Sequence, residues 1–177
     1  MFRFYVSIHV SIHTATNTSR SYALQRHRPL TLPSTIELPT ATDDLTEHSP
    51  SLIGFIHLVT LFRPFDDEFV ALWNKTRDDC SPAYLSILQK QLSDALPAYL
   101  NSIESQAVEL RVNQQWLRNV VWQLGISNGC VSSGNNNPKM TVQYPVENPR
   151  VLIAMIAGFS PHLMEVHGVG LVRLNPI

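Results

Sequence analysis

The stretch SQAVELRVNQQWLRNVVWQL, residues 105–124, points to a helical fold because its apolar residues recur at helical spacing. The three-and-four rhythm places one set of side chains on the same face of a helix: Leu110, Leu117, Val120, Val121 and Leu124. At about 1.5 Å of rise per residue, this helix would be about 30 Å long and would cross a small domain. We therefore expect it to be the central helix of an all-α unit.

Other helix starts are marked by Ser or Asn followed directly by proline. The side-chain oxygen can cap a helix, and proline suits the first helical position because that N–H has no intrahelical partner. These pairs are Ser49-Pro50, Ser81-Pro82, Asn148-Pro149 and Ser160-Pro161. A further start is expected at Asp66, where the carboxylates of Asp66, Asp67 and Glu68 meet the positive end of the helix dipole. We expect helices at residues 50–62, 66–78, 82–96, 97–125, 149–158 and 161–167.

Pro97 interrupts an apolar rhythm that otherwise runs from Leu85 to Ile103. Because a proline inside a helix costs about 3 kcal/mol or more, we expect a kink or a tight helix restart at this point. Gly125 and the polar run SNGCVSSGNNNP, residues 127–138, are expected to end the central helix in a long loop.

The N-terminal part of the chain has a different composition. Residues 14–50 are rich in Thr, Ser and Pro, and their prolines disfavour a long helix. We therefore expect residues 1–48 to be a disordered or misannotated leader and linker, and residues 49–177 to be a partial helical domain. The first 36 residues contain arginine but no acidic residue, as in a mitochondrial presequence, whereas the apolar residues from Phe2 to Ile12 alternate at the period of a strand.

Composition limits the classes of function. With 44% hydrophobic and 15% charged residues among 177, the chain is expected to be one globular domain. Its net charge of −1 supplies no basic surface for phosphate contacts, which argues against nucleic-acid binding by this chain alone. No apolar run approaches the roughly 20 residues that cross a bilayer, so no membrane association is expected. Cys80 and Cys130 are expected to be reduced thiols.

The residues that could carry chemistry favour structural roles. His162 and His167 are five residues apart and do not match the helical metalloprotease spacing. His57, between apolar neighbours, is expected to be half-buried, and the acidic residues 66–68 are explained as a cap and dipole partners. We therefore assign no catalytic or metal-binding residue, expect no enzyme activity, and leave cofactor-binding residues unassigned.

The predicted central helix carries several glutamines, and the chain has three tryptophans. We favour a solvated face for Gln106, Gln114, Gln115 and Gln123. The alternative is hydrogen bonding across helices in a ligand-sensing pocket, because buried amides need partners. Trp73, Trp116 and Trp122 are expected to be core or rim aromatics, whose indole N–H groups need acceptors when buried.

Segments of the chain, in this order, resemble the regulatory (middle homology) region of fungal Zn(II)2Cys6 binuclear zinc-cluster transcription factors. They are LFRPFDDEFVALWNK (61–75), LSILQKQLSDALP (85–97), the stretch at 105–124, and MEVHGVGL (164–171). The order and spacing of these segments carry the resemblance, which covers about residues 51–172. It implies an irregular multi-helix regulatory domain of a nuclear protein that controls transcription by RNA polymerase II.

The same resemblance implies the partners. These would be proteins of the transcription machinery or a small-molecule effector. The family's zinc cluster needs six closely spaced cysteines, and this chain has two, so zinc and DNA contacts would belong to an upstream module and the chain would be a fragment. A helical protein-interaction scaffold unrelated to transcription and a mitochondrial helical protein are the alternatives.

Overall fold

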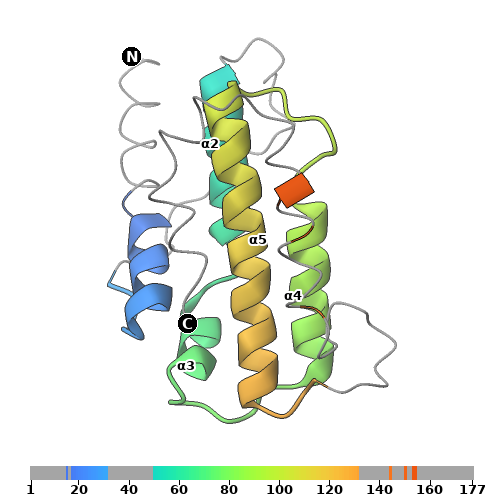
Figure 1. Cartoon of the computed structure of the whole chain (residues 1–177). Coiled ribbons are helices and arrows are strands. Elements are labelled where there is room, and N and C mark those ends of the chain that lie inside the picture. Colours follow the sequence, from blue (N-terminus) through green and yellow to red (C-terminus); the bar gives the residue numbers. More distant parts are fainter. Residues whose placement is uncertain are drawn as a thin grey trace. The chain divides into compact units, whose positions relative to one another are not determined.

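The computed structural model describes residues 15, 17–31, 50–131, 144, 150, 153 and 154. Regular secondary structure in these residues is helical, without strands, so the predicted all-α class is confirmed (Figure 1). The chain divides into two compact units, residues 1–79 and 80–177. The two sides of the boundary that we predicted between residues 48 and 49 therefore belong to the same unit.

The first unit contains helices α2, Pro50–Phe62, and α3, Asp67–Trp73. The helix predicted at 50–62 is confirmed, whereas the one predicted at 66–78 ends five residues early. The reason is a left-handed turn at Lys75, whose φ is 57°. There the N–H groups of Lys75 and Thr76 donate to the carbonyls of Leu72 and Ala71, at 3.1 and 2.9 Å, which closes the helix in a Schellman motif.

A helical segment at residues 17–26 also belongs to the first unit, and our prediction of a linker is wrong there. One face of this segment is buried: Asn17, Arg20, Ala23 and Leu24 are each at most 5% exposed. Prolines do not prevent the helix because Pro29 follows its end. The rest of the predicted leader, residues 1–14 and 32–48, lies outside the described residues.

Trp73 at the end of α3 holds this segment. Its indole Nε1 donates to the carbonyl oxygen of Leu24 at 2.9 Å, which satisfies an acceptor in the last turn of the segment. The Trp73 ring stacks on His27, with ring centroids 5.0 Å apart. The expectation that Trp73 is a core or rim aromatic with a bonded N–H is confirmed.

The second unit is built on helices α4, Pro82–Asp94, and α5, Glu104–Ser127. As predicted, Ser81 caps α4: its hydroxyl oxygen accepts from the N–H of Tyr84 at 3.1 Å. The two helices lie side by side and run in opposite directions (Figure 1). The face of α5 predicted to be buried is confirmed, and its buried apolar residues are Val108, Leu110, Leu117, Val120, Val121 and Leu124.

Both ends of α5 differ from the prediction of a helix at 97–125. Residues 95–103 form a non-helical link, so the helix restarts seven residues later than expected after Pro97. At its other end α5 continues past Gly125 to Ser127. The chain then turns at Gly129, whose φ of 66° suits glycine, and the N–H of Cys130 donates to the Gly125 carbonyl at 2.8 Å.

Of the last two predicted helices, the structure tests only a small part. Arg150, Ile153 and Ala154 are helical, in agreement with the helix predicted at 149–158. The remaining residues of that helix and all of 161–167 lie outside the described part of the chain.

Candidate functional site

Buried glutamines lie where α4 meets α5. Gln89 is fully buried, and Gln114 and Gln115 are each 4% exposed, so the predicted solvated face is wrong for Gln114 and Gln115. The Nε2 of Gln89 donates to the carbonyl of Arg118 at 2.8 Å. Of the glutamines that we considered, Gln114 makes the alternative hydrogen bond across helices, to the carbonyl of Leu92, whereas Gln115 accepts from Arg118 within α5. Gln106 and Gln123 are half-buried.

Arg111 and Gln114, one turn apart on α5, hold the end of α4 and the link that follows it. Gln114 Nε2 donates to the carbonyl of Leu92 at 2.7 Å, which satisfies an acceptor in the last turn of α4. Arg111 Nη2 donates to the carbonyls of Pro97 and Ala98, at 2.5 and 3.0 Å. We call Arg111, Gln114 and these three carbonyls the carbonyl clamp.

The clamp stabilises the backbone at the point where the chain leaves α4. Proline has no N–H and cannot continue the hydrogen-bond ladder of α4. The carbonyl oxygens of Pro97 and Ala98 carry partial negative charge, which the guanidinium of Arg111 stabilises. Burial lowers the pKa of Arg111 from its ordinary value, but an arginine remains charged in proteins. The charge of Arg111 is therefore matched to backbone dipoles.

A second set of polar side chains, which we call the Arg118 cluster, consists of Gln89, Gln115, Arg118 and Tyr144. Arg118 Nη1 donates to Gln115 Oε1 at 3.3 Å, and its guanidinium carbon lies 5.6 Å from the centre of the Tyr144 ring. Tyr144 is only 4% exposed. Burial raises the pKa of the Tyr144 hydroxyl, and the nearby charge of Arg118 opposes this shift.

The Arg118 cluster contains polar atoms that no described residue satisfies. They are an acceptor, Gln89 Oε1, a donor, Arg118 Nε, and the hydroxyl of Tyr144. Buried polar groups in proteins normally have a hydrogen-bond partner. One acceptor, one donor and one hydroxyl of the cluster are therefore left for partners such as ordered water.

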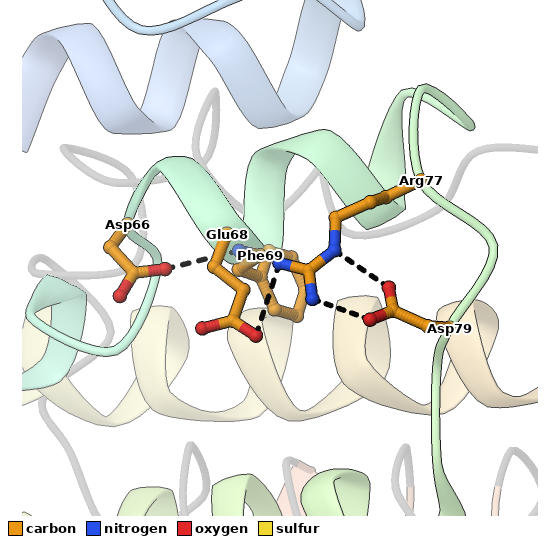
Figure 2. A network of polar contacts seen from close by, with 5 residues as sticks. All are labelled: Asp66, Glu68, Phe69, Arg77 and Asp79. Atoms are coloured by element: carbon orange, nitrogen blue, oxygen red, sulfur yellow. Dashed lines mark hydrogen bonds and ion pairs between the residues drawn. The ribbon is translucent and has the colours of Figure 1, made fainter.

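The acidic residues at the start of α3 form a separate network in the first unit (Figure 2). Asp66 accepts from the N–H of Phe69 at 3.0 Å, so the predicted capping role is confirmed. Glu68 lies 3.3 Å from Arg77, and Arg77 also binds both carboxylate oxygens of Asp79. The hydrogen bond to Asp79 raises the pKa of Arg77, and the same bond lowers the pKa of Asp79.

This network is at the surface. The side chains of Glu68, Arg77 and Asp79 are 53, 46 and 61% exposed. Exposed ion pairs contribute little to stability because water and salt screen them. The network organises the turn after α3 and shows no feature of an acid–base site.

The remaining candidate site residues are the histidines and cysteines. His57 on α2 is half-buried, as predicted. His162 and His167 lie outside the described residues. Cys80 and Cys130 are not in a disulfide, and both are half-buried. Over the described ranges, no group of three or more His, Cys, Asp or Glu could hold a metal ion. Nor is any helix in those ranges long and apolar enough to span a membrane.

Sequence reasoning missed the buried Asn17 and Arg20 and the role of Arg111. Arg20 is 3% exposed, and burial lowers its pKa, while the charges of Asp66 and Asp67 oppose the shift. The only sequence signal for this helix is the spacing of three between Asn17, Arg20 and Ala23, with Leu24 next to it. Arg111 carries a clearer signal, because it lies three residues before Gln114 on a predicted helix.

Comparison with known proteins assigns no family to this chain. No family model, no curated protein and no solved structure matches it. The carbonyl clamp and the Arg118 cluster are thus the features on which a functional argument is built.

Proposed function

We propose that this chain is a non-enzymatic regulatory domain from a fungal zinc-cluster transcription factor, which acts in the nucleus on transcription by RNA polymerase II. The supporting observation is the order of the family-like segments along the helices. The segment at 61–75 contains α3, the segment at 85–97 contains most of α4, and the segment at 105–124 lies within α5. The fourth segment, 164–171, lies outside the described residues.

The chemistry of the hairpin formed by α4 and α5 suits binding better than turnover. Its buried polar side chains are amides, which are joined by the half-buried guanidinium groups of Arg111 and Arg118 and by the buried phenol of Tyr144 from outside the hairpin. The amides and guanidinium groups donate hydrogen bonds to carbonyl oxygens, which positions helices. Tyr144 keeps its proton at neutral pH, as tyrosines ordinarily do, and burial raises its pKa further. These groups would orient a small effector or transmit the position of one helix to the other.

The proposal assigns zinc and DNA to a different part of the parent protein. Zinc would be held by six cysteines upstream, and DNA would be contacted only through that cluster. The hairpin would contact proteins of the transcription machinery or a small-molecule effector. The upstream genomic sequence is a direct test, since six closely spaced cysteines in frame would support the proposal, and a long open frame without them would contradict it.

A reporter assay tests the activity itself. The chain is fused to an unrelated DNA-binding domain, and transcription from a matching promoter is measured in a fungal cell. We expect output that differs from that of the DNA-binding domain alone, and we expect Leu117→Asp to abolish the difference because Leu117 is fully buried. The matched control is Ile87→Asp on α4, where the side chain is 57% exposed. Output equal to that of the DNA-binding domain alone would contradict the proposal.

The second candidate is a helical protein-interaction scaffold unrelated to transcription. It is favoured by Tyr99 and Ile103, which are 84% and 50% exposed on the link between α4 and α5. Large exposed apolar side chains are common at protein interfaces. A cytoplasmic location of the tagged full-length product would favour this scaffold, whereas a mitochondrial location would favour the third alternative, a mitochondrial helical protein.

A further inference from the structure

Cys80 and Cys130 meet at the end of the α4–α5 hairpin opposite the link. They are 50 residues apart in sequence, yet the Sγ of Cys130 lies 3.7 Å from the carbonyl oxygen of Cys80. That oxygen is only two covalent bonds from the Cα that carries the Cys80 thiol. The fold of the second unit therefore brings the two thiol-bearing residues next to each other.

Both cysteines are held by helix-capping structures. Cys80 immediately precedes Ser81, whose side chain caps α4. Cys130 follows the left-handed Gly129, and its N–H donates to the carbonyl of Gly125 at 2.8 Å. Because each cysteine adjoins a helix cap, rotation of the two side chains is a freedom that remains for bringing the sulfur atoms together.

The environment of the pair also allows a reagent to reach it. Both residues are half-buried, and neither is in a disulfide. The Sγ of Cys130 lies near two carbonyl oxygens, that of Cys80 and that of Asn128 at 3.6 Å. A thiol in this position is neither sealed in the apolar core nor fully in solvent, so a small oxidant can approach it.

We propose that Cys80 and Cys130 are a redox-sensitive pair, which a hydroperoxide converts into an intramolecular disulfide that locks the open end of the hairpin. In the first step, one thiol attacks the peroxide oxygen and becomes a sulfenic acid, with release of water or an alcohol. In the second step, the other thiol attacks the sulfenic sulfur, the S–S bond forms, and the sulfenic oxygen leaves as water. The peroxide is reduced by the two electrons that the thiols lose.

The disulfide would covalently join the start of α4 to the end of α5. The polar contacts of the hairpin, from the carbonyl clamp to the Gln89 bond, would then lie inside one closed loop. A loop of about 50 residues loses much of its conformational freedom in the unfolded state when it is closed. We therefore expect oxidation to stabilise the second unit without changing its fold. This inference does not depend on the proposed function.

The test uses the purified full chain, reduced and freed of reductant, with hydrogen peroxide as the oxidant. Remaining thiols are alkylated, and intact mass and peptide mapping identify the product. We expect a monomer that has lost two hydrogens and contains a Cys80–Cys130 crosslink. It should form at least about tenfold faster in buffer than in concentrated urea, because folding raises the effective concentration of one thiol at the other. The melting temperature should rise by roughly 5–15 °C and return when dithiothreitol is added.

Single variants provide the controls. Cys80→Ser and Cys130→Ser should give no intramolecular crosslink and no rise in melting temperature, and the remaining cysteine should form a sulfenic acid that dimedone traps. The proposal would be overturned if oxidation of the folded wild type gave only disulfide-linked dimers or sulfinic acids. It would equally be overturned if the crosslink formed no faster in the folded than in the unfolded chain.

Discussion

Two non-glycine residues of the described part of the chain, His27 and Lys75, have left-handed backbone conformations, with φ of 51° and 57°. Each follows the end of a helical segment, where an L-residue costs about 1–2 kcal/mol relative to a right-handed conformation. The two positions differ in what the side chain does. His27 stacks on Trp73, whereas Lys75 is exposed and its structural role lies in its backbone.

We predict that Lys75→Gly stabilises the protein by about 0.5–1 kcal/mol, because glycine adopts this conformation without strain. His27→Gly should not, since it removes the stacking partner of Trp73 along with the strain. Urea unfolding monitored by circular dichroism measures both changes. A lower midpoint for Lys75→Gly than for the wild type would show that this strain estimate is wrong.

The buried glutamines lead to a prediction in which two similar substitutions differ. Gln114→Met should destabilise by about 1–3 kcal/mol, because it leaves the carbonyl of the fully buried Leu92 without its side-chain partner. Gln89→Met should lower the free energy of unfolding by less than about 0.5 kcal/mol, because it also removes an Oε1 that has no partner. The Arg118 carbonyl that loses the Gln89 bond lies inside α5, where the helix supplies another donor. Methionine keeps the side-chain volume in both. Equal losses in urea unfolding would contradict the distinction.

Tyr144 predicts a dependence of stability on alkaline pH. Its pKa is raised in the folded state, so the unfolded chain loses the phenolic proton first as the pH rises. The stabilisation that Tyr144 gives to the folded state is therefore complete below about pH 10, the pKa of tyrosine in the unfolded chain. It is lost as the pH rises through the higher pKa of the folded state. Tyr144→Phe should lose less stability than the wild type between about pH 9 and pH 11, as measured by urea unfolding at each pH. Identical pH profiles would show that another group causes the loss.

At the scale of the element, Ser-Pro capping pairs predicted the starts of α2 and α4, and apolar periodicity predicted the buried face of α5, because most buried positions of these helices are apolar. The buried side of residues 17–26 contains a polar residue in each of its first turns, Asn17 and Arg20, so it lacks the pattern that marks a core helix. The glutamines of α5 were misplaced for a related reason. The spacing of residues along α5 cannot show that a carbonyl at the end of a neighbouring helix, such as that of Leu92, lies within hydrogen-bonding distance of a buried amide.

The segment at 17–26 gives a prediction that departs from our expectation from the sequence, in which residues 1–48 are a disordered or misannotated leader and linker. Leu24→Asp should destabilise by about 3 kcal/mol or more, because Leu24 is 2% exposed and a carboxylate there would be desolvated. Tyr22→Asp, at a side chain that is 56% exposed, should change stability by less than about 0.5 kcal/mol. Thermal unfolding followed by circular dichroism compares them. Similar melting temperatures for the two variants would place this face of the helix in solvent.

At the scale of the whole molecule, the two compact units meet in sequence between Asp79 and Cys80, at the end of a run of exposed residues that extends from Lys75 to Asp79. Composition could not predict this boundary. The Pro- and Ser-rich stretch before residue 50 marks a change in local chain character, whereas a compact unit is defined by contacts between distant residues, such as Trp73 with Leu24. Net charge, in contrast, is a whole-chain property that the sequence states directly.

The net charge of −1 predicts that this chain alone does not bind DNA specifically. Near-neutral charge removes most of the counterion release that drives phosphate binding. An electrophoretic shift assay at low salt on pooled promoter fragments should show no retained complex. Fusion to an upstream six-cysteine cluster should restore binding if the proposed function is right. A salt-resistant, sequence-selective complex of the unfused chain would contradict the prediction.

The contacts of the hairpin are nested, which has a consequence for how it folds. Arg111 reaches back 14 residues to Pro97, Gln114 reaches 22 to Leu92, and Gln89 and Arg118 are 29 apart. Each contact shortens the chain that the next one must close, so the entropy of loop closure is lost in small steps. The contacts of the hairpin can therefore form in order of increasing sequence separation, beginning next to the link between α4 and α5. The contact between its cysteines, which are 50 residues apart, would then form last and open first. Backbone amides near the cysteines should therefore exchange hydrogen faster than those near the carbonyl clamp.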